Sequence, residues 1–353
     1  MTTISEQVSE QLTRPVSKRV SQSVFDGSRL RVVLLVDVND GAQQEFLEAY
    51  EQLCNQVAQV PGHVSDQLCQ SIENPSQWLI TSEWESAPPF LAWVNSEEHV
   101  EMVKPLHNCV RDTRSLRFHV VRETGGPSAD AVRVLQADPR MGDGVIRHAL
   151  TFTVRPGSEA EVARILADYA SPQARVDDST RLCRTSLFMH GNRVVRAIEV
   201  RGDLLAALRH VARQPEVRAV EEAINPYLEQ ERDLNDQESA RVFFTRAALP
   251  AVHHVSAEEP AEGERHALYY PARPGCGMRL AEVLAQQDEA ASEDPASPVL
   301  HSTIFQRDDV VVRLVEHRSG AVPDTTPAPA LAALLDGDAV RMRLITDRRS
   351  PAA

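Results

Sequence analysis

The sequence predicts an α+β protein that consists of three consecutive copies of one unit of about 100 residues, each with the element order βαββαβ. Three observations support this prediction. A segment that starts with Arg and ends at Gly recurs at residues 31–41, 147–157 and 265–275. Each copy alternates apolar side chains as a strand does, and apolar residues at helical spacing follow it. A pair of strands joined by a short turn then follows in every copy.

The first copy begins with a strand at 31–38, which ends in a turn at Gly41. Its first helix is indicated by the spacing of Phe46, Leu47, Tyr50, Leu53 and Val57. Strands at 64–73 and 77–85 are joined at Asn74-Pro75, and a second helical stretch precedes a last strand at 116–122. This order is that of the ferredoxin-like split βαβ unit, in which both helices cover one face of an antiparallel sheet.

The second and third copies repeat these elements. Their hairpins are predicted at 182–190 with 193–201 and at 299–306 with 310–318, and their last strands at 240–245 and 340–346. Two stretches rich in Pro, Gly, Ala or acidic residues fit linkers. The predicted organisation is a disordered tail at 1–28, a domain at 29–122, a linker at 123–144, a domain at 145–246, a linker at 247–263 and a shorter domain at 264–349.

Composition limits the functional classes. Of the 353 residues, 42% are apolar and 25% charged, and no apolar run approaches the ~20 residues that span a bilayer. The net charge of −14 disfavours nucleic acid, which binds basic surfaces. The five cysteines are scattered without zinc-site spacing, and no dinucleotide or phosphate-loop motif is present. We therefore expect a cytoplasmic protein with free thiols, no nucleic-acid partner and no membrane span.

Strand parity assigns the faces of the sheets. Val32, Leu34, Val36 and Val38 form one apolar set that should meet the helices, so Arg31 points to the other face. On that face Arg recurs early in the first strand and Glu late in the third, as Arg31 with Glu83, Arg147 with Glu199 and Arg265 with Glu316. Cross-strand ion pairs explain this repetition more simply than three charged functional sites. The face also carries Val33, Leu35, Ala149 and Tyr269, so we expect another sheet to cover it.

The first copy resembles the antibiotic biosynthesis monooxygenase family. The resemblance is carried by Pro61-Gly62-His63-Val64, by the strand Trp78-Leu-Ile-Thr-Ser-Glu-Trp-Glu-Ser86, and by Glu98-His99 and Lys104-Pro105-Leu106-His107 in the following helix. The later copies are similar to the SchA/CurD-like family, through residues 181–200 and, more weakly, 302–316. The resemblance implies a protein of bacterial aromatic polyketide biosynthesis. It also implies oxygenation in a pocket between sheet and helices, with molecular oxygen as co-substrate and no flavin, haem or metal cofactor.

In the first copy the resemblance singles out Trp84, which parity places on the helix face with Trp78, Ile80 and Ser82. There Trp84 could stack on a planar ring or donate its N–H, although an ordinary core tryptophan fits equally. The family often has Asn where this chain has Ile80, which weakens the transfer of a donor role. Trp78, Ser82 and Met102 are the predicted substrate-binding neighbours.

Two histidines of the second helical stretch are candidate bases. His99 and His107 lie eight residues apart, and either could titrate near neutrality. The alternative is that both are surface or capping residues without a catalytic role. Pro105 between them is predicted to kink the helix toward the pocket mouth.

The later copies carry other side chains at the matching inward positions. Arg196 and Arg313 stand at the position of Ile80, and Val200 and His317 at that of Trp84. His148 and His266 share the face of these arginines by parity. A buried cation needs a partner or a ligand, so these positions could form anion or phenolate sites. Alternatively the pockets are closed and the arginines reach an edge of the sheet.

The resemblance implies that such units pair sheet to sheet in a dimeric α+β barrel. Three units would leave one unpaired, so we expect a homodimer in which two units pair within the chain and the third pairs with its copy. The leading functional prediction is a cofactor-independent monooxygenase that hydroxylates an aromatic polyketide or oxidises it to a quinone. The alternatives are a polyketide cyclase, in which a base and an oxyanion site promote aldol closure, and a non-catalytic subunit that assists a partner such as a polyketide cyclase.

Overall fold

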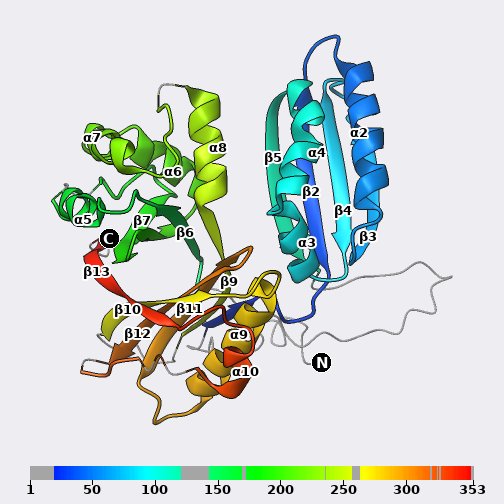
Figure 1. Cartoon of the computed structure of the whole chain (residues 1–353). Coiled ribbons are helices and arrows are strands. Elements are labelled where there is room, and N and C mark those ends of the chain that lie inside the picture. Colours follow the sequence, from blue (N-terminus) through cyan, green and yellow to red (C-terminus); the bar gives the residue numbers. More distant parts are fainter. Residues whose placement is uncertain are drawn as a thin grey trace, which may run out of the picture.

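The computed structural model describes residues 20–120, 143–168, 172–234, 236–256, 263–318, 320–323, 325 and 327–350. Within these ranges the strands form two separate sheets, one of four strands and one of nine (Figure 1). The smaller sheet belongs to the first third of the chain. The larger one is built by the remaining two thirds, together with a short strand from the N-terminal segment.

The N-terminal domain is an antiparallel sheet covered on one face by three helices (Figure 1). Its strand order β3-β4-β2-β5 is the ferredoxin-like order. Val32, Val36 and Val38 of β2 are buried against the helices, as the alternation predicts. The elements are β2 (Leu30–Val38), α2 (Gln43–Val57), β3 (His63–Gln70), β4 (Gln77–Trp84), α3 (Ala87–Val94), α4 (Glu97–Asn108) and β5 (Val110–His119).

The remaining chain closes an eight-stranded barrel. Its strand order is β9-β11-β12-β10-β13-β7-β8-β6, and a pairing of β6 with β9 closes the ring. The first half contains β6 (Val145–Thr153), α5 (Glu159–Ala167), β7 (Arg181–His190), β8 (Arg193–Arg201), α6 (Leu204–Ala212), α7 (Pro215–Ile224), a 3-10 turn η1 (Asn225–Tyr227), α8 (Gln237–Ala247) and β9 (Ala248–Ser256). The second half contains β10 (Gly263–Pro271), α9 (Gly277–Glu293), β11 (Val299–Arg307), β12 (Val310–Arg318), α10 (Pro329–Ala332) and β13 (Val340–Arg349).

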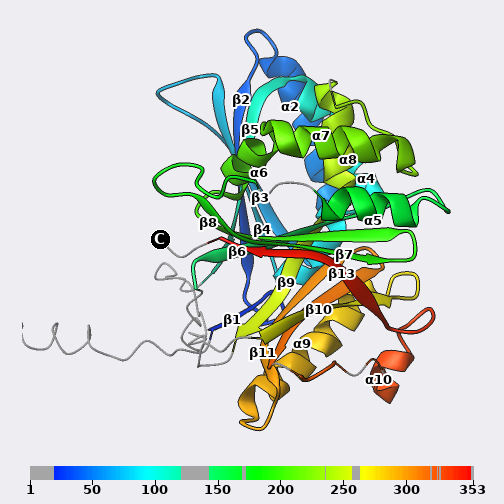
Figure 2. The ribbon, with the colours of Figure 1, turned by 90° about the vertical axis from the view of Figure 1, so that its left-hand side faces the viewer.

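The two halves of the barrel are related by an approximate twofold repeat. The orders β7-β8-β6-β9 and β11-β12-β10-β13 correspond to each other strand by strand, and the halves join through β9 with β11 and β13 with β7. Figure 2 shows α6 and α7 on one side of the barrel and α9 and α10 on the other. The helices therefore lie outside, and the opposite face of every strand points into the barrel.

The predicted Arg/Glu register is confirmed in all three places. Arg31 is opposite Glu83, Arg147 opposite Glu199 and Arg265 opposite Glu316. The expectation that another sheet covers this face holds for the barrel, where Ala149 is fully buried in its interior. At the N-terminal sheet no other sheet of the described chain covers this face, Leu35 is 43% exposed and Phe118 50% exposed, and coverage by a second copy stays a prediction.

Several predicted boundaries are wrong around the end of the second copy. The strand predicted at 240–245 lies in helix α8, and the linker predicted at 247–263 contains strand β9. The run of β-branched and aromatic residues in 240–245 is typical of a strand. In the structure Phe243 and Ala247, one helical turn apart, bury the same face of α8. Pro250 and two adjacent histidines obscured the strand pattern of β9.

The N-terminal tail and the first linker also differ from the prediction. Val20–Ser23 forms strand β1, which pairs with β9 as far as Ser256, so this part of the predicted tail is ordered. The rest of the predicted tail before Val20, and most of the predicted linker 123–144, lie outside the described residues. Strand β5 begins at Val110, six residues before the predicted start of the last strand of the first copy.

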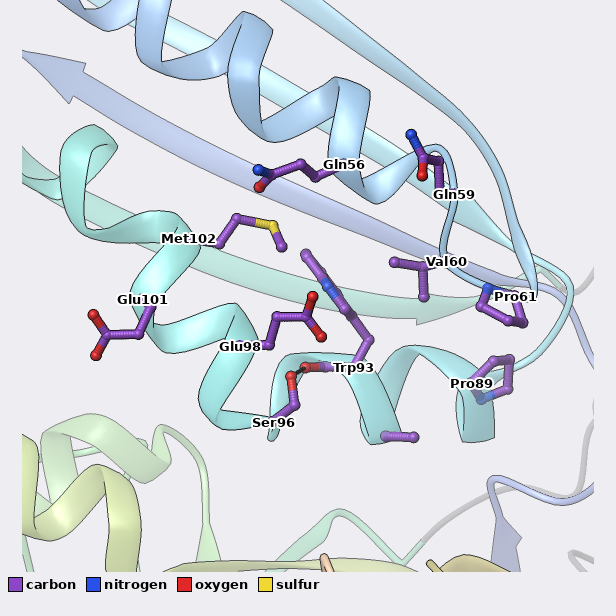
Figure 3. A pocket seen from close by; sticks show the side chains of 11 residues that line it. Gln56, Gln59, Val60, Pro61, Pro89, Trp93, Ser96, Glu98, Glu101 and Met102 are labelled. Atoms are coloured by element: carbon purple, nitrogen blue, oxygen red, sulfur yellow. Dashed lines mark hydrogen bonds between the residues drawn. The ribbon is translucent and has the colours of Figure 1, made fainter.

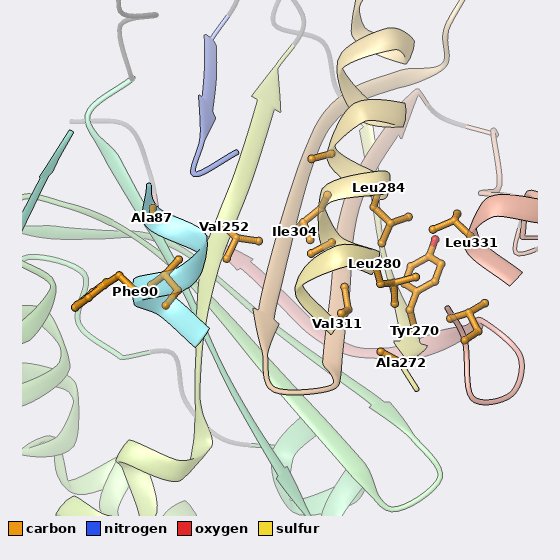
Figure 4. Close-up of a cluster of buried hydrophobic side chains, with 14 of the residues drawn as sticks. Ala87, Phe90, Val252, Tyr270, Ala272, Leu280, Leu284, Ile304, Val311 and Leu331 are labelled. Carbon is orange, nitrogen blue, oxygen red and sulfur yellow. The ribbon is translucent and has the colours of Figure 1, made fainter. Parts of the chain in front are cut away.

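One apolar cluster links the N-terminal domain to the barrel. Figure 4 shows Ala87 and Phe90 of α3 beside Val252 of β9, with Leu280 and Leu284 of α9 beyond. A long hydrogen bond of 3.5 Å from Arg307 Nη2 to the carbonyl oxygen of Asn95 adds a polar contact. The barrel therefore supports helix α3, which carries part of the site described next.

Candidate functional site

A pocket of about 850 Å³ opens in the N-terminal domain between the end of α2, helix α3 and the first turns of α4 (Figure 3). Its volume lies in the range that binds small organic molecules. Val60, Pro89 and Met102 supply apolar wall, while Glu98 and Glu101 place carboxylates at the α4 side. The pocket is thus mostly apolar with a few polar groups, which is the usual composition of a ligand site.

Trp93 forms the inner wall of this pocket. It lies in the last turn of α3, and in Figure 3 its ring stands between Met102 and Val60. The ring stacks on Trp84 with centroids 5.4 Å apart and an interplanar angle of 27°. It meets the ring of His99 edge-on at 4.3 Å. Trp93 therefore separates the open pocket from Trp84 and His99, which lie behind it.

Two buried ring nitrogens in this cluster have no hydrogen-bond partner in the part of the chain that the structure describes. They are Nε1 of Trp93 and Nδ1 of His99. Buried polar groups in native proteins are nearly always paired, so each such exception calls for an explanation. These two nitrogens are therefore hydrogen-bonding groups that the described residues leave unused.

Trp84 anchors the cluster from the sheet side. It is the last residue of β4, is fully buried, and donates from Nε1 to Oγ of Ser82 at 2.5 Å. Its ring contacts those of Phe90 and His63 edge-on, with ring centroids 5.4 Å and 5.2 Å apart. Such contacts fix the ring plane, so Trp84 is a rigid support for Trp93.

A half-buried acid, Asp66, lies behind this support. Nε2 of His63 is 2.8 Å from Oδ2 of Asp66. Burial raises the pKa of Asp66, and the neighbouring His63 and the Ser82 hydroxyl oppose that rise. Burial also raises the pKa of Tyr50 to about 12, with Asp66 contributing, so this phenol stays protonated at neutral pH. Hydrogen bonds therefore connect the Trp84 ring N–H to the Ser82 hydroxyl, and the Ser82 hydroxyl to the Asp66 carboxylate.

His99 is held in its neutral form. Burial lowers its pKa to about 4, and His107 and Arg117 add to the effect. Its backbone N–H is held by the N-cap of α4, because Oγ of Ser96 accepts from it at 3.1 Å. A neutral imidazole with an unpartnered nitrogen can accept a proton or a hydrogen bond.

The predicted residues of the first copy divide into two groups. Trp84 and His99 contact Trp93, Ser82 accepts a hydrogen bond from Trp84, and Met102 lines the pocket itself. Trp78 lies further along the sheet, where its ring contacts Phe46 at 5.4 Å. His107 is exposed in the last turn of α4 and does not line the pocket, since its helix turns that position outward.

The arginines of the later copies do not form the predicted open anion sites. Nη1 of Arg196 is 2.6 Å from a carboxylate oxygen of Glu221, a buried residue of α7 that also pairs with Arg232. Arg313 pairs with Asp288, a fully buried residue of α9. Each arginine is therefore neutralised by a carboxylate from the helix above it, which is how buried cations are normally satisfied.

The predicted histidines of the later copies lie away from the N-terminal pocket. Burial lowers the pKa of His148 to about 4, and Arg117 of the N-terminal domain adds to the effect. The rings of His266 and His317 are 5.9 Å apart in the second half of the barrel. The predicted histidines and arginines of the barrel therefore do not contribute to the aromatic cluster of the N-terminal domain.

Sequence reasoning missed three members of the cluster. Trp93 follows Pro88 and Pro89 in a short helix that had been merged with α4, so its direction could not be assigned. His63 and Asp66 both face inward although parity places them on opposite faces, because a β-bulge lies between His63 and Ser65. The Pro61-Gly62-His63 motif was the available signal for this end of the strand.

Comparisons with known proteins agree with this division of the chain. The family described as antibiotic biosynthesis monooxygenase matches residues 29–105, and the SchA/CurD like domain matches residues 145–257. "Polyketide synthase CurD" of Streptomyces cyaneus is 61% identical over 95% of this chain and 98% of its own length. "Protein SchA" of Streptomyces halstedii is 58% identical over 96% of this chain and 98% of its own length.

Among solved structures, SnoaB, a cofactor-independent oxygenase from Streptomyces nogalater, is 18% identical over 28% of this chain and 96% of its own, with a TM-score of 0.26. In the described ranges no helix is long and apolar enough to cross a membrane. The same ranges hold no group of three or more His, Cys, Asp or Glu side chains placed to bind a metal ion.

Proposed function

The chain belongs to the SchA/CurD family of polyketide proteins, and we propose that it is an oxygenase that oxidises an aromatic polyketide in the pocket of its N-terminal domain. The match of residues 29–105 to the antibiotic biosynthesis monooxygenases supports the reaction class. The names of the two relatives support the pathway. The reaction proposed needs molecular oxygen as co-substrate and no flavin, haem or metal.

The observation that carries the proposal is the cluster at the inner wall of the 850 Å³ pocket, in which Trp93 stacks on Trp84 and meets His99 edge-on. Aromatic rings bind a planar polyphenol by offset stacking. The unpartnered Nε1 of Trp93 can donate to a phenolate or enolate oxygen, and the unpartnered Nδ1 of His99 can accept a proton. Binding, charge stabilisation and base are thus supplied by neighbouring side chains.

The proposed reaction balances without another reductant. A base removes a proton from an electron-rich phenol or anthrone, and the resulting anion gives two electrons to oxygen, forming a carbon–oxygen bond to a hydroperoxide. The hydroperoxide then loses water as its O–O bond breaks, leaving a carbonyl. One oxygen atom enters the product and the other leaves as water, with the substrate as the only electron donor.

His99 is the proposed base and Trp93 the proposed ring platform. The low pKa of His99 keeps the imidazole unprotonated at neutral pH, and the substrate anion that forms beside it would raise that pKa, because a neighbouring negative charge favours the imidazolium. Because Trp93 stands between the pocket and His99, substrate reaches His99 when the Trp93 side chain rotates or the substrate edge passes it. Val60, Pro89 and Met102 supply apolar surface beside the proposed position of the anion.

Two histidines of α4 give a matched test. His99→Gln removes the buried imidazole, whereas His107→Gln removes an exposed one from the same helix. With a reduced anthrone-type polyphenol in air, we expect quinone formation by His99→Gln to fall by about 10²-fold or more, as for loss of a general base, with His107→Gln unchanged. Equal activity of the two variants would refute the assigned role of His99. Trp93→Phe should mainly lower kcat, because the stacking ring remains but the donor to the developing anion is lost.

We also propose that the chain is a homodimer through the open face of the N-terminal sheet. Leu35 and Phe118 are exposed there, beside the pair of Arg31 with Glu83 at 2.9 Å. The corresponding face of each barrel half is covered by the other half. A second copy would cover this face in the same way and would shield the exposed apolar side chains.

A polyketide cyclase on the same scaffold, or an accessory role beside such a cyclase, is the alternative. A cyclase would use the same base and donor without oxygen. Product that forms at the same rate with and without oxygen would favour it over the oxygenase.

A further inference from the structure

The barrel interior contains a second cavity of about 300 Å³, which shares no lining residue with the N-terminal pocket. It lies at the end of the barrel where β13 finishes, and Cys183, Arg349 and Ser350 stand at its mouth. Cys183 and Ser350 are half-buried, and the Arg349 side chain is 53% exposed. Barrels of this size normally fill their interior with side chains, so a polar cavity here calls for an explanation.

The approximate twofold repeat of the barrel shows how the cavity arises. Arg184 of β7 is opposite Glu199, and His301 of β11 is opposite Glu316, so Arg184 and His301 occupy equivalent positions. In the same way Asp347 is opposite Ser186, and His254 is opposite Thr303. The charged pair Arg184 and Asp347 of one side is therefore replaced by the shorter pair His301 and His254 on the other.

On the first side the ion pair fills the interior. Arg184 donates to both carboxylate oxygens of Asp347, at 2.8 and 2.5 Å, and to Glu316 at 2.6 Å. Arg265 donates to Ser186 at 3.1 Å and to Glu199 at 2.5 Å. The guanidinium groups and carboxylates of the two halves thus interlock across the barrel.

On the second side the equivalent contacts are incomplete. Nδ1 of His254 is 2.9 Å from Oγ1 of Thr303, and its ring lies nearly parallel to His301 with centroids 6.4 Å apart. Nε2 of His254 is buried without a hydrogen-bond partner among the described residues, although the residue is only 3% exposed. Arg147, the equivalent of Arg265, turns to Asp143 and donates to it at 2.6 and 3.2 Å. The second side therefore contains the cavity, and Nε2 of His254 lies there without a hydrogen-bond partner among the described residues.

The side chains that line the cavity include more positive than negative groups. Four arginines and two glutamates line it: Arg147, Arg184, Arg265, Arg349, Glu199 and Glu316. Asp143 and Asp347 pair with two of these arginines but do not line the cavity. Burial lowers the pKa values of His254 and His301, so both stay neutral at pH 7. The forks of Arg147 and Arg184 already bind Asp143 and Asp347, so a ligand carboxylate would share these guanidinium groups with carboxylates of the chain and would meet the unpartnered Nε2 of His254.

We propose that this barrel cavity is a binding site for a small organic carboxylate, whose oxygens face Arg147, Arg265 and Nε2 of His254. A volume of 300 Å³ corresponds to about ten water molecules, so the occupant has about ten non-hydrogen atoms, the size of one substituted ring. This site is independent of the proposed oxygenation. It lies in the part of the chain that the monooxygenase match does not cover.

The test uses the full chain with salicylate as the probe and salicylamide, its uncharged analogue, as the control. Isothermal titration should show saturable binding of salicylate that weakens with salt, and at least tenfold weaker binding of salicylamide. Modification by a thiol reagent, read by mass spectrometry, locates the site. Salicylate should protect Cys183 at the mouth and leave the exposed Cys69 of the N-terminal domain unaffected.

The barrel repeat supplies the variant. The double substitution His254→Asp with His301→Arg copies the ion pair of Arg184 with Asp347 into the cavity, and should abolish protection of Cys183 while quinone formation in the N-terminal pocket is retained. If that variant does not fold, Arg349→Gln at the mouth should weaken binding, with Arg175→Gln, an exposed arginine remote from the cavity, as its control. Undiminished labelling of Cys183 at saturating salicylate, or equal binding of salicylamide, would overturn the proposal.

Discussion

Replacing His99 by Gln tests the electrostatics of the aromatic cluster. The pKa of His99 falls from 6.5 to about 4 on folding, because burial penalises the charged ring. Between these two values the unfolded chain holds a proton that the folded chain does not, so stability rises with pH in this window and falls as the pH drops. From pH 7 to pH 5 this single group costs the fold about 2 kcal/mol. The Gln variant should lack that loss.

All three tryptophans lie in the N-terminal domain, so their fluorescence reports its unfolding specifically. Urea titrations at pH 7 and pH 5 should show that the wild type loses about 2 kcal/mol more than His99→Gln between the two pH values. His107→Gln should lose nearly as much stability as the wild type, since burial of His99 is the main cause of its low pKa and His107 only adds to it. The half-buried Asp66 is present in all three proteins, so its titration cancels in the comparison. The same pH dependence in His99→Gln as in the wild type would refute a buried, neutral His99.

Three further outcomes follow from the structure. Asp288→Asn leaves Arg313 with an uncompensated buried charge and should destabilise the barrel by about 3–5 kcal/mol. Urea unfolding followed by far-UV circular dichroism measures this loss. A loss below about 1 kcal/mol would contradict the buried ion pair. Gly62→Ala places a side chain where φ is +84°, and its Cβ would lie 2.6 Å from Pro89. The variant should therefore lose more than about 1 kcal/mol of unfolding free energy and shift α3. Quinone formation at the wild-type rate would count against a pocket wall whose position depends on this turn. Phe118→Glu places a charge on the open sheet face and should give a monomer by light scattering where the wild type is a dimer; a wild-type monomer would rule out the proposed interface.

Local rules of the sequence were sufficient where the chain follows a regular period. The alternation in β2 predicts which of its side chains meet the helices, and Val36 and Val38 are indeed buried. The repeated Arg and Glu predict the pairing of the first and third strands in each copy, down to the residue. The first inference uses only the alternation of side chains along a strand, and the second also uses the antiparallel pairing of the first and third strands.

Other features depend on contacts that no local pattern encodes. The residues at 240–245 have high strand propensity but form helix α8, because tertiary burial of Phe243 overrides a propensity. Arg196 looked like an anion site because its partner Glu221 lies on a helix far along the chain. The barrel cavity arises from a difference between two equivalent positions, which becomes visible only when the register of both halves is known.

The most direct test of the proposed oxygenation follows the fate of labelled oxygen. The purified protein is incubated with a reduced anthrone-type polyphenol under ¹⁸O₂ and, in parallel, without oxygen, with heat-denatured protein as the control for spontaneous oxidation. We predict that the native protein forms quinone only in the presence of oxygen, and that one ¹⁸O atom enters each product molecule while the other appears in water. Product that forms equally fast without oxygen, or that carries no label, would contradict an oxygenase.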